Sequence, residues 1–246
     1  HGRSPPDSPF RCRSPPRVIT GDIDPAKTRE LVGKYFGSIP KGPDVVQPKV
    51  VEPLLTSEVR NVVYDRIQLP AVVVAYRIPA NGTADFYAVD LLNRLLSNGN
   101  SSRLNKALKD QQQKAVYTGA FSLPFEDPGL AIMFSIANGG VDVNDLERAM
   151  DAEVQRIQRE GVPQAELEKL KAQLETEAIQ DKSRVAGIAS NLATAYMLLG
   201  DAALVNSELD RYLSVTSDDM KRAANTYFTK NGRVVLHYLP MSQKQP

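Results

Sequence analysis

Between Leu91 and Pro124 the spacing of the apolar residues changes from helical to strand-like, and this change limits the folds open to the chain. One helix face is predicted from Ala88, Leu91, Leu92, Leu95 and Leu96. A second, short helix is predicted after Asn98-Gly99-Asn100, with Ser101 or Ser102 as its N-cap and Leu104, Ala107 and Leu108 on its apolar face. A strand follows, in which Val116, Thr118, Ala120 and Ser122 alternate with Tyr117, Gly119, Phe121 and Leu123.

The other predicted elements fall into blocks. Further strands are predicted at Val59–Ile67, Ala71–Ile78, Leu130–Asn138 and Arg233–Leu239. Helices are predicted at Ala84–Ser97, Val143–Glu160, Pro163–Gln180, Lys182–Leu199, Ser207–Leu213 and Ser217–Thr229. Because strands and helices do not alternate singly, the pattern favours an α+β fold with a mostly antiparallel sheet over a doubly wound parallel one.

Composition excludes several classes of protein. The 246 residues include 30 basic and 29 acidic ones, so no global field attracts nucleic acid or an anionic membrane. The longest apolar runs, such as Ala193–Leu199, are far shorter than the roughly 20 residues of a membrane span. Cys12 is the only cysteine, which precludes an internal disulfide.

The N-terminal part has its own character. Residues His1–Arg17 are dominated by Pro, Ser and Arg, and this composition predicts disorder. From Arg17 to Pro43 we expect a short strand, a turn and a helix capped by Asp24, with Pro25 in its first turn. The three prolines within Lys41–Pro53 then predict an extended connection.

Residues for chemistry are sparse. The two histidines, His1 and His237, cannot form a His-x-x-Glu-His zinc motif, and His237 is predicted to be a half-exposed structural residue of the last strand. Cys12 has no evident base, and no serine lies in a Gly-x-Ser-x-Gly elbow. The carboxylates of Glu166, Glu168, Glu175 and Glu177 alternate with lysines, which is typical of a solvated helix face.

Several segments, in their order, carry a family resemblance. They are GDIDP, FGSIP, SSRLNKALKDQQQKAVYTGAF and REGVPQAELEKLK. This succession resembles the C-terminal, non-metal half of the pitrilysin/insulinase family of zinc metallopeptidases. The resemblance implies a domain with helices packed on one face of its sheet. It also implies that zinc belongs to another half, and that the two halves form a chamber that binds a peptide.

Site residues follow from the same resemblance. Tyr117 falls on a family tyrosine that contacts the peptide, and Lys109 falls where an arginine is usual, although the spacing to Tyr117 is one residue longer. Arg103, in the same segment, is the alternative cation. We therefore expect substrate binding by Tyr117 together with Lys109 or Arg103. From the residues alone, without the resemblance, the favoured reading is a tyrosine that covers a sheet face and two bases that are surface charges.

The resemblance also implies an organisation and a function. We expect a lead or artefact at 1–17, the tail of a preceding domain at 18–43, a linker at 44–56, the main domain at 57–240 and a tail at 241–246. The chain then needs no cofactor of its own and is inactive in isolation. Its expected partners are a peptide and a zinc-bearing domain or subunit, or a second copy in a homodimer. The bacterial periplasm or cytoplasm is expected rather than a membrane, and the alternative function is a non-catalytic structural or interaction subunit.

Overall fold

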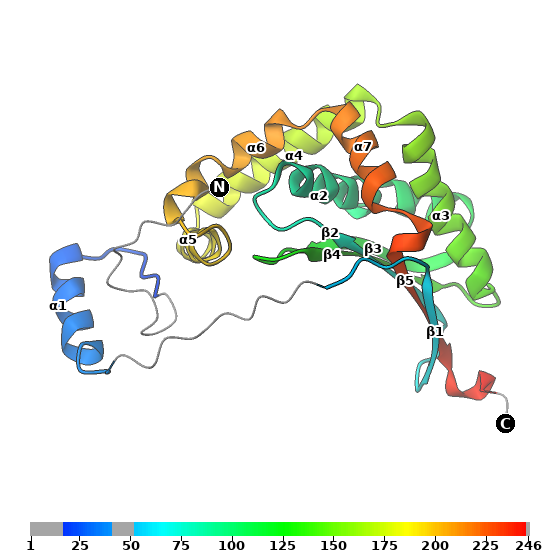
Figure 1. Cartoon of the computed structure of the whole chain (residues 1–246), viewed down its shortest axis with the longest axis horizontal. Helices are drawn as coiled ribbons and strands as arrows, with labels where there is room; N and C mark the ends of the chain where they lie inside the picture. The colour runs from blue at the N-terminus through cyan, green and yellow to red at the C-terminus, as the bar shows by residue number, and fades with distance from the viewer. Residues whose placement is uncertain (1–16, 41–51, 245–246) are drawn as a thin grey trace. The chain divides into compact units, whose positions relative to one another are not determined.

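A computed structural model describes residues 17–40 and 52–244 of the chain (Figure 1). The chain divides into two compact units. One comprises the described parts of His1–Pro53 together with Glu175–Leu209, and the other comprises Leu54–Leu174 and Asp210–Pro246. The expected disordered lead and most of the expected linker lie outside the described residues. The domain boundaries proposed from the sequence therefore stay a prediction.

The larger unit contains a five-stranded sheet. Its strands are β1 (Val59–Asp65), β2 (Ala71–Ile78), β3 (Ala115–Leu123), β4 (Gly129–Ala137) and β5 (Arg233–Pro240). They lie in the order β1-β5-β2-β4-β3, and only the β1–β5 pair is parallel. The predicted α+β fold with a mostly antiparallel sheet is thus confirmed. The last strand of the chain inserts between the first two, so β1 and β2 are not neighbours.

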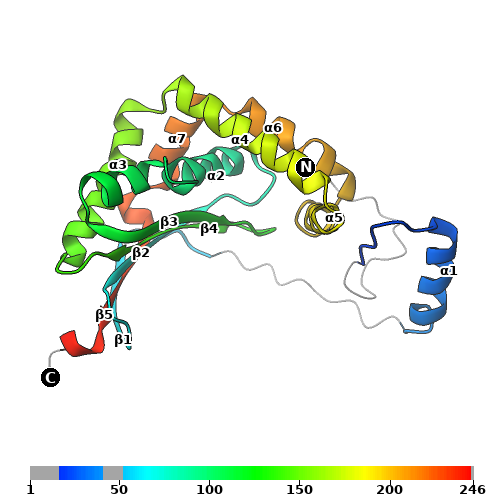
Figure 2. The same ribbon diagram turned by 180° about the vertical axis from the view of Figure 1, so that it is seen from behind.

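Helices of this unit pack on one face of the sheet, as Figures 1 and 2 show. They are α2 (Ala84–Ser97), the π-helix η1 (Asn105–Gln111), α3 (Val143–Glu160) and α7 (Ser217–Tyr227), and the unit also holds most of α6 (Glu208–Ser214) and most of α4 (Gln164–Lys182). Alternate residues of β2, such as Val72 and Val74, are fully buried beneath the helices. Tyr76 continues this row and stacks on Phe228 with ring centroids 4.8 Å apart. The predicted packing of helices on one face is confirmed.

Local signals in the sequence set the helix ends. The Thr83 hydroxyl accepts a hydrogen bond from the Phe86 N–H at the start of α2. At α7, Thr216 and Asp219 form a reciprocal capping box. Gly161 ends α3 with a φ of 80°, a backbone conformation that a residue with a side chain rarely adopts. The caps of α2 and α7 satisfy backbone N–H groups that those helices leave unpaired, and at the end of α3 the Gly161 N–H donates to the Ile157 carbonyl.

The smaller unit contains α1 (Pro25–Phe36), α5 (Val185–Leu199) and a short 3₁₀ helix (Ala202–Asn206). The predicted cap of α1 is confirmed, because the Asp24 carboxylate accepts from the N–H groups of Ala26 and Lys27. The predicted strand at its start is wrong. Residues 17–20 pair with no strand of the described chain, and the Thr20 hydroxyl instead donates to the Val185 carbonyl.

The apolar face of α1 is exposed to solvent in the described structure. No residue of α1 is buried, and Tyr35 is 65% exposed. The Arg17 guanidinium lies 3.8 Å from the centre of the Phe36 ring, which it covers in part. None of the helices in the described ranges is long and apolar enough to cross a membrane.

Candidate functional site

Tyr117 lies on β3, an edge strand, directly after an irregularity in the pairing with β4. Ala115 pairs with Ala137 and Tyr117 with Ile136, so Val116 is one residue more than β4 can match. This β-bulge breaks the simple alternation expected from the sequence, and both Val116 and Tyr117 are exposed. Beyond the bulge the alternation is regular. The bulge thus places Tyr117 on the face of the sheet that the helices leave uncovered.

We call this uncovered face beside the β3 edge the open face. It carries aromatic and aliphatic side chains from β3 and β4: Tyr117, Phe121, Ile132, Phe134 and Ile136. Tyr117 is 54% exposed, and its ring lies 5.6 Å from that of Phe134. Its hydroxyl has no hydrogen-bond partner in the described part of the chain. A polar group that stands unpaired on an apolar surface is available to a ligand.

Lys109 lies on η1, whose geometry the sequence did not foresee. A helix was predicted here, but a π-helix is present, and at its end the Gln112 N–H donates to the Ala107 carbonyl, five residues back, at 3.0 Å. Neither Ser101 nor Ser102 caps it. The Ser101 hydroxyl accepts from Lys169, and that of Ser102 accepts from the Asn105 side chain.

The chain between Lys109 and Tyr117 contains two features that take up extra length. A π-helical turn holds about one residue more than an α-helical turn, and the β-bulge at Val116 adds one unmatched residue. Gln113, between them, has a φ of 51°, which is rare for a residue other than glycine. Either feature can accommodate the single extra residue that separates Lys109 from Tyr117. No hydrogen bond or ion pair joins these two side chains in the described structure.

Arg103 is engaged elsewhere. Its Nε donates to the Glu166 carboxylate at 2.9 Å, and its side chain is only 12% exposed. Its Nη1 is buried and has no partner among the described residues. Glu166, which was predicted to lie on a solvated helix face, therefore also forms an ion pair with Arg103. The structure shows no contact between Arg103 and Tyr117, and the role of all three predicted substrate residues stays a prediction.

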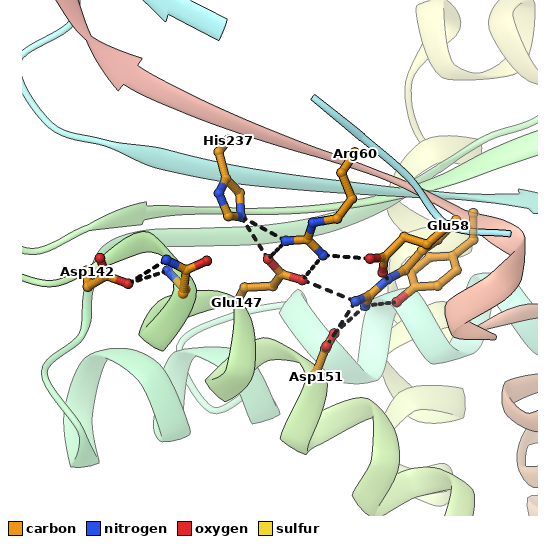
Figure 3. A network of polar contacts seen from close by, with 9 residues as sticks. Glu58, Arg60, Asp142, Glu147, Asp151 and His237 are labelled. Carbon is orange, nitrogen blue, oxygen red and sulfur yellow. Dashed lines mark hydrogen bonds and ion pairs between the residues drawn. The ribbon is translucent and has the colours of Figure 1, made fainter. Parts of the chain in front are cut away.

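A second polar constellation, which the sequence did not reveal, lies under the other end of the sheet (Figure 3). Glu147 of α3 is at its centre. One carboxylate oxygen accepts from Arg60 of β1 at 2.9 Å and from Arg233 of β5 at 3.1 Å. The other accepts from Arg60 at 2.5 Å and lies 2.7 Å from Nε2 of His237. Both oxygens of Glu147 are thus fully occupied by two strands.

Arg233 extends this cluster. Its side chain is only 3% exposed, and it contacts Asp151 at 2.5 Å and Glu58 at 2.6 Å. Burial alone would lower the pKa of Arg233, but bonds to Asp151, Tyr76 and Glu58 raise it above its ordinary value. For the neighbouring Tyr76, whose charged form is the anion, burial has the opposite effect and raises the pKa to about 12. We call Glu58, Arg60, Glu147, Asp151, Arg233 and His237 the ion cluster.

The ion cluster corrects the prediction for His237. The sequence predicted a half-exposed histidine, but the residue is 8% exposed and faces the helices. Burial raises the pKa of Glu147, whereas bonds from Arg60 and His237 lower it, and the net pKa is below the usual range. Every charged group of the ion cluster is paired with another member of the cluster, so we infer that the ion cluster holds β1 and β5 on α3.

The described residues do not suit a metal ion. No group of three or more His, Cys, Asp or Glu side chains within 17–40 and 52–244 could hold one. Beside His237, the Glu147 carboxylate is shared by two arginines, whose charges oppose a cation. We therefore derive no catalytic step through zinc on these residues.

Comparisons with known proteins show which family the chain resembles. Residues 18–174 match a family described as the Peptidase M16 inactive domain. The zinc protease PqqE of Helicobacter pylori is 27% identical over 214 residues, which are 86% of this chain and 48% of that protein. The solved inactive peptidase domain of a zinc protease from Bordetella parapertussis is 27% identical, with a TM-score of 0.65, over 75% of this chain and 97% of that structure.

A protease structure from Helicobacter pylori shares the fold at a TM-score of 0.83 and 24% identity, over 90% of this chain and 54% of that one. The chain thus spans about half the length of these Helicobacter pylori relatives. The family match covers more than half of the chain and confirms the resemblance to the pitrilysin/insulinase peptidases. The chain therefore belongs to the inactive-domain family of the M16 peptidases.

Proposed function

We propose that this chain is the half of a zinc endopeptidase that binds the peptide but carries no metal. The zinc-bearing half would be a second domain or subunit of the same family, and a zinc ion held there would supply the activation of water for peptide hydrolysis. The proposal extends the family assignment to an activity. It is supported chiefly by one observation, an exposed tyrosine hydroxyl without a partner on the open face beside an edge strand.

The position of Tyr117 suits contact with an extended peptide. In the described part of the chain β3 pairs with β4 alone, so the backbone groups along its other side are open to a further strand. A peptide there would pass close to Tyr117, and its apolar side chains would meet the aromatic rings of the open face. The hydroxyl could donate a hydrogen bond to the carbonyl oxygen of the peptide as negative charge develops on it.

Lys109 is the cation that we assign to the same task. Its side chain makes no hydrogen bond or ion pair in the described structure, whereas Arg103 is committed to Glu166. A lysine on a flexible stem can reach over a range of positions, which suits a residue whose spacing from Tyr117 is enlarged. We therefore rank Lys109 above Arg103 as a partner of Tyr117 in peptide binding.

Reconstitution tests this proposal. A fluorogenic peptide library would be offered to this chain, to the zinc-bearing half and to an equimolar mixture, with bound zinc measured after dialysis. We expect cleavage by the mixture and none by this chain, which should retain no stoichiometric zinc. Stoichiometric zinc on this chain would contradict the proposal. If the zinc-bearing half cleaves as fast without this chain, the alternative of a structural or interaction subunit is correct.

A further inference from the structure

Phe134 occupies a special place on the open face. It lies on β4 directly opposite Gly119 of β3. Its ring reaches diagonally to both neighbours of that glycine on the same face, 5.6 Å from the Tyr117 ring and 6.2 Å from the Phe121 ring. Diagonal pairs on a sheet are within reach of aromatic side chains. Phe134 is thus the ring that links the two exposed aromatic residues of β3.

Gly119 makes this arrangement possible. A Cβ atom built on Gly119 would lie 2.6 Å from Cε1 and 2.9 Å from Cζ of Phe134, closer than real Cβ contacts. The ring therefore fills the space that a side chain at residue 119 would take. Glycine within a strand ordinarily weakens it, because it costs entropy and packs nothing. Its presence here has a packing reason, since an aromatic ring covers it from the neighbouring strand.

The Tyr117 ring has few other constraints. It is 54% exposed, follows a β-bulge and has a hydroxyl without a described partner. An exposed tyrosine would exchange between rotamers in nanoseconds. The ring of Phe134 lies beside it at an interplanar angle of 33° and restricts that exchange. The position of the hydroxyl above the open face therefore depends on Phe134.

We propose that Phe134, seated over Gly119, is a positioning residue that holds the Tyr117 hydroxyl where it meets the carbonyl oxygen of the bound peptide. This inference rests on the proposed peptide-binding role of Tyr117. Phe134 need not touch the reacting atoms, because it acts through the tyrosine. Since a misplacement of about 1 Å costs on the order of 10²-fold in rate, loss of the supporting ring should be visible in turnover.

Two other roles for Phe134 give different signatures. If its ring merely contacts a peptide side chain, its loss raises KM, and it does so whether or not the Tyr117 hydroxyl is present. If the ring only packs the sheet, its loss lowers the melting temperature and the amount of folded enzyme, but not kcat per folded molecule. A positioning role lowers kcat at nearly constant KM, and only while the hydroxyl is there to be positioned.

The test is a double-mutant cycle in the complete enzyme, with both halves present. The variants are Phe134→Leu, Tyr117→Phe and their combination. Phe134→Tyr keeps a ring at residue 134 and serves as the rescue, and Leu130→Ala, near the start of β4 and outside the open-face set, is the control for an apolar loss on that strand. We expect Phe134→Leu to lower kcat by at least about tenfold and to cause no further loss in the Tyr117→Phe background. Phe134→Tyr and Leu130→Ala should retain the kcat of the parent enzyme.

Gly119→Ala provides a second route if Phe134→Leu folds poorly. It should displace the ring and lower kcat in the same way, and the added Phe134→Leu change should restore the melting temperature without restoring kcat. Equal losses in both tyrosine backgrounds, or a change in KM only, would overturn the positioning role while leaving the proposed function intact. If Tyr117→Phe itself has no effect, the proposed role of Tyr117 fails, and the positioning role fails with it.

Discussion

Glu147→Gln tests the assignment of the ion cluster to stability. Gln has nearly the shape of Glu but lacks the charge, so the change leaves the packing of α3 intact. It removes the anion that Arg60 and His237 contact at 2.5 and 2.7 Å and that Arg233 contacts at 3.1 Å. Since the Glu147 side chain is only 8% exposed, water cannot replace these contacts.

The size of the expected loss in unfolding free energy depends on the contacts that Arg60 and Arg233 keep in the variant. Removal of one partner from a buried ion pair costs about 3–5 kcal/mol of unfolding free energy. Arg233 keeps Asp151 and Glu58, and Arg60 is 42% exposed, so the lower end applies and we expect about 3 kcal/mol. For a unit of this size each kcal/mol lowers the melting temperature by about 2–4 °C, which gives a shift of about 6–12 °C.

Thermal and urea unfolding followed by circular dichroism would measure this change. Glu160→Gln is the matched control on the same helix, because Glu160 forms an exposed pair with Arg156 that should contribute less than about 1 kcal/mol. A Glu147→Gln variant as stable as Glu160→Gln would refute the stabilising role. The ion cluster would then be free for another function, and its assignment as a clamp between β1, β5 and α3 would be wrong.

Three further predictions use other parts of the structure. The pKa of Glu147 is lowered in the fold, so the contribution of Glu147 to stability is present above the pKa of the unfolded state, near 4.5, and is lost as pH falls through the pKa of the folded state. Acid titration of the unfolding free energy should therefore show a loss of stability below about pH 4.5, and this loss should be smaller in Glu147→Gln. Thr216→Ala removes the hydroxyl that accepts from the Asp219 N–H and should cost about 1 kcal/mol in urea unfolding, whereas Thr216→Ser should cost little, and equal losses would contradict the cap. The isolated chain should self-associate or pair with a partner because α1 buries none of its residues, and a strictly monomeric chain by light scattering at high concentration would count against this.

The sequence predicted the local features of the fold well, because short-range signals set them. Asp24 before Pro25 defines the start of α1, and the turn residues around Asp127 predicted the connection that joins β3 to β4. The predicted bounds of α2 and α3 are the bounds that the structure shows. Each of these features depends on contacts within a few positions along the chain.

The ion cluster was missed because it depends on long-range pairing. Only the insertion of β5 beside β1 brings Arg60 and His237 onto the same face, above α3. A signal was nevertheless present, since Glu147 interrupts the apolar face of α3 between Leu146 and Met150. A charge on the buried face of a helix requires a counter-charge, and basic residues at alternating strand positions could supply it.

The site was predicted in part. The strand that carries Tyr117 was expected, but the bulge at Val116 and the π-helix around Lys109 were not. Both are irregularities of one residue, which periodicity cannot locate, and both lie on the segment whose length exceeds the family spacing. The contact of Arg103 with Glu166 likewise joins residues far apart in sequence. The predicted grouping of Tyr117 with a cation therefore remains to be tested by activity.

The turnover of a Tyr117→Phe variant, in the enzyme assembled from both halves, tests the central claim most directly. Tyr238→Phe, a tyrosine on β5 and on the same face of the sheet, is the matched control. If the Tyr117 hydroxyl steadies the developing oxyanion, kcat should fall on the order of 10²-fold while the melting temperature stays unchanged, because the ring still packs on Phe134. Unchanged turnover in Tyr117→Phe, or an equal loss in Tyr238→Phe, would show that Tyr117 is a structural residue and that the account of this site is wrong.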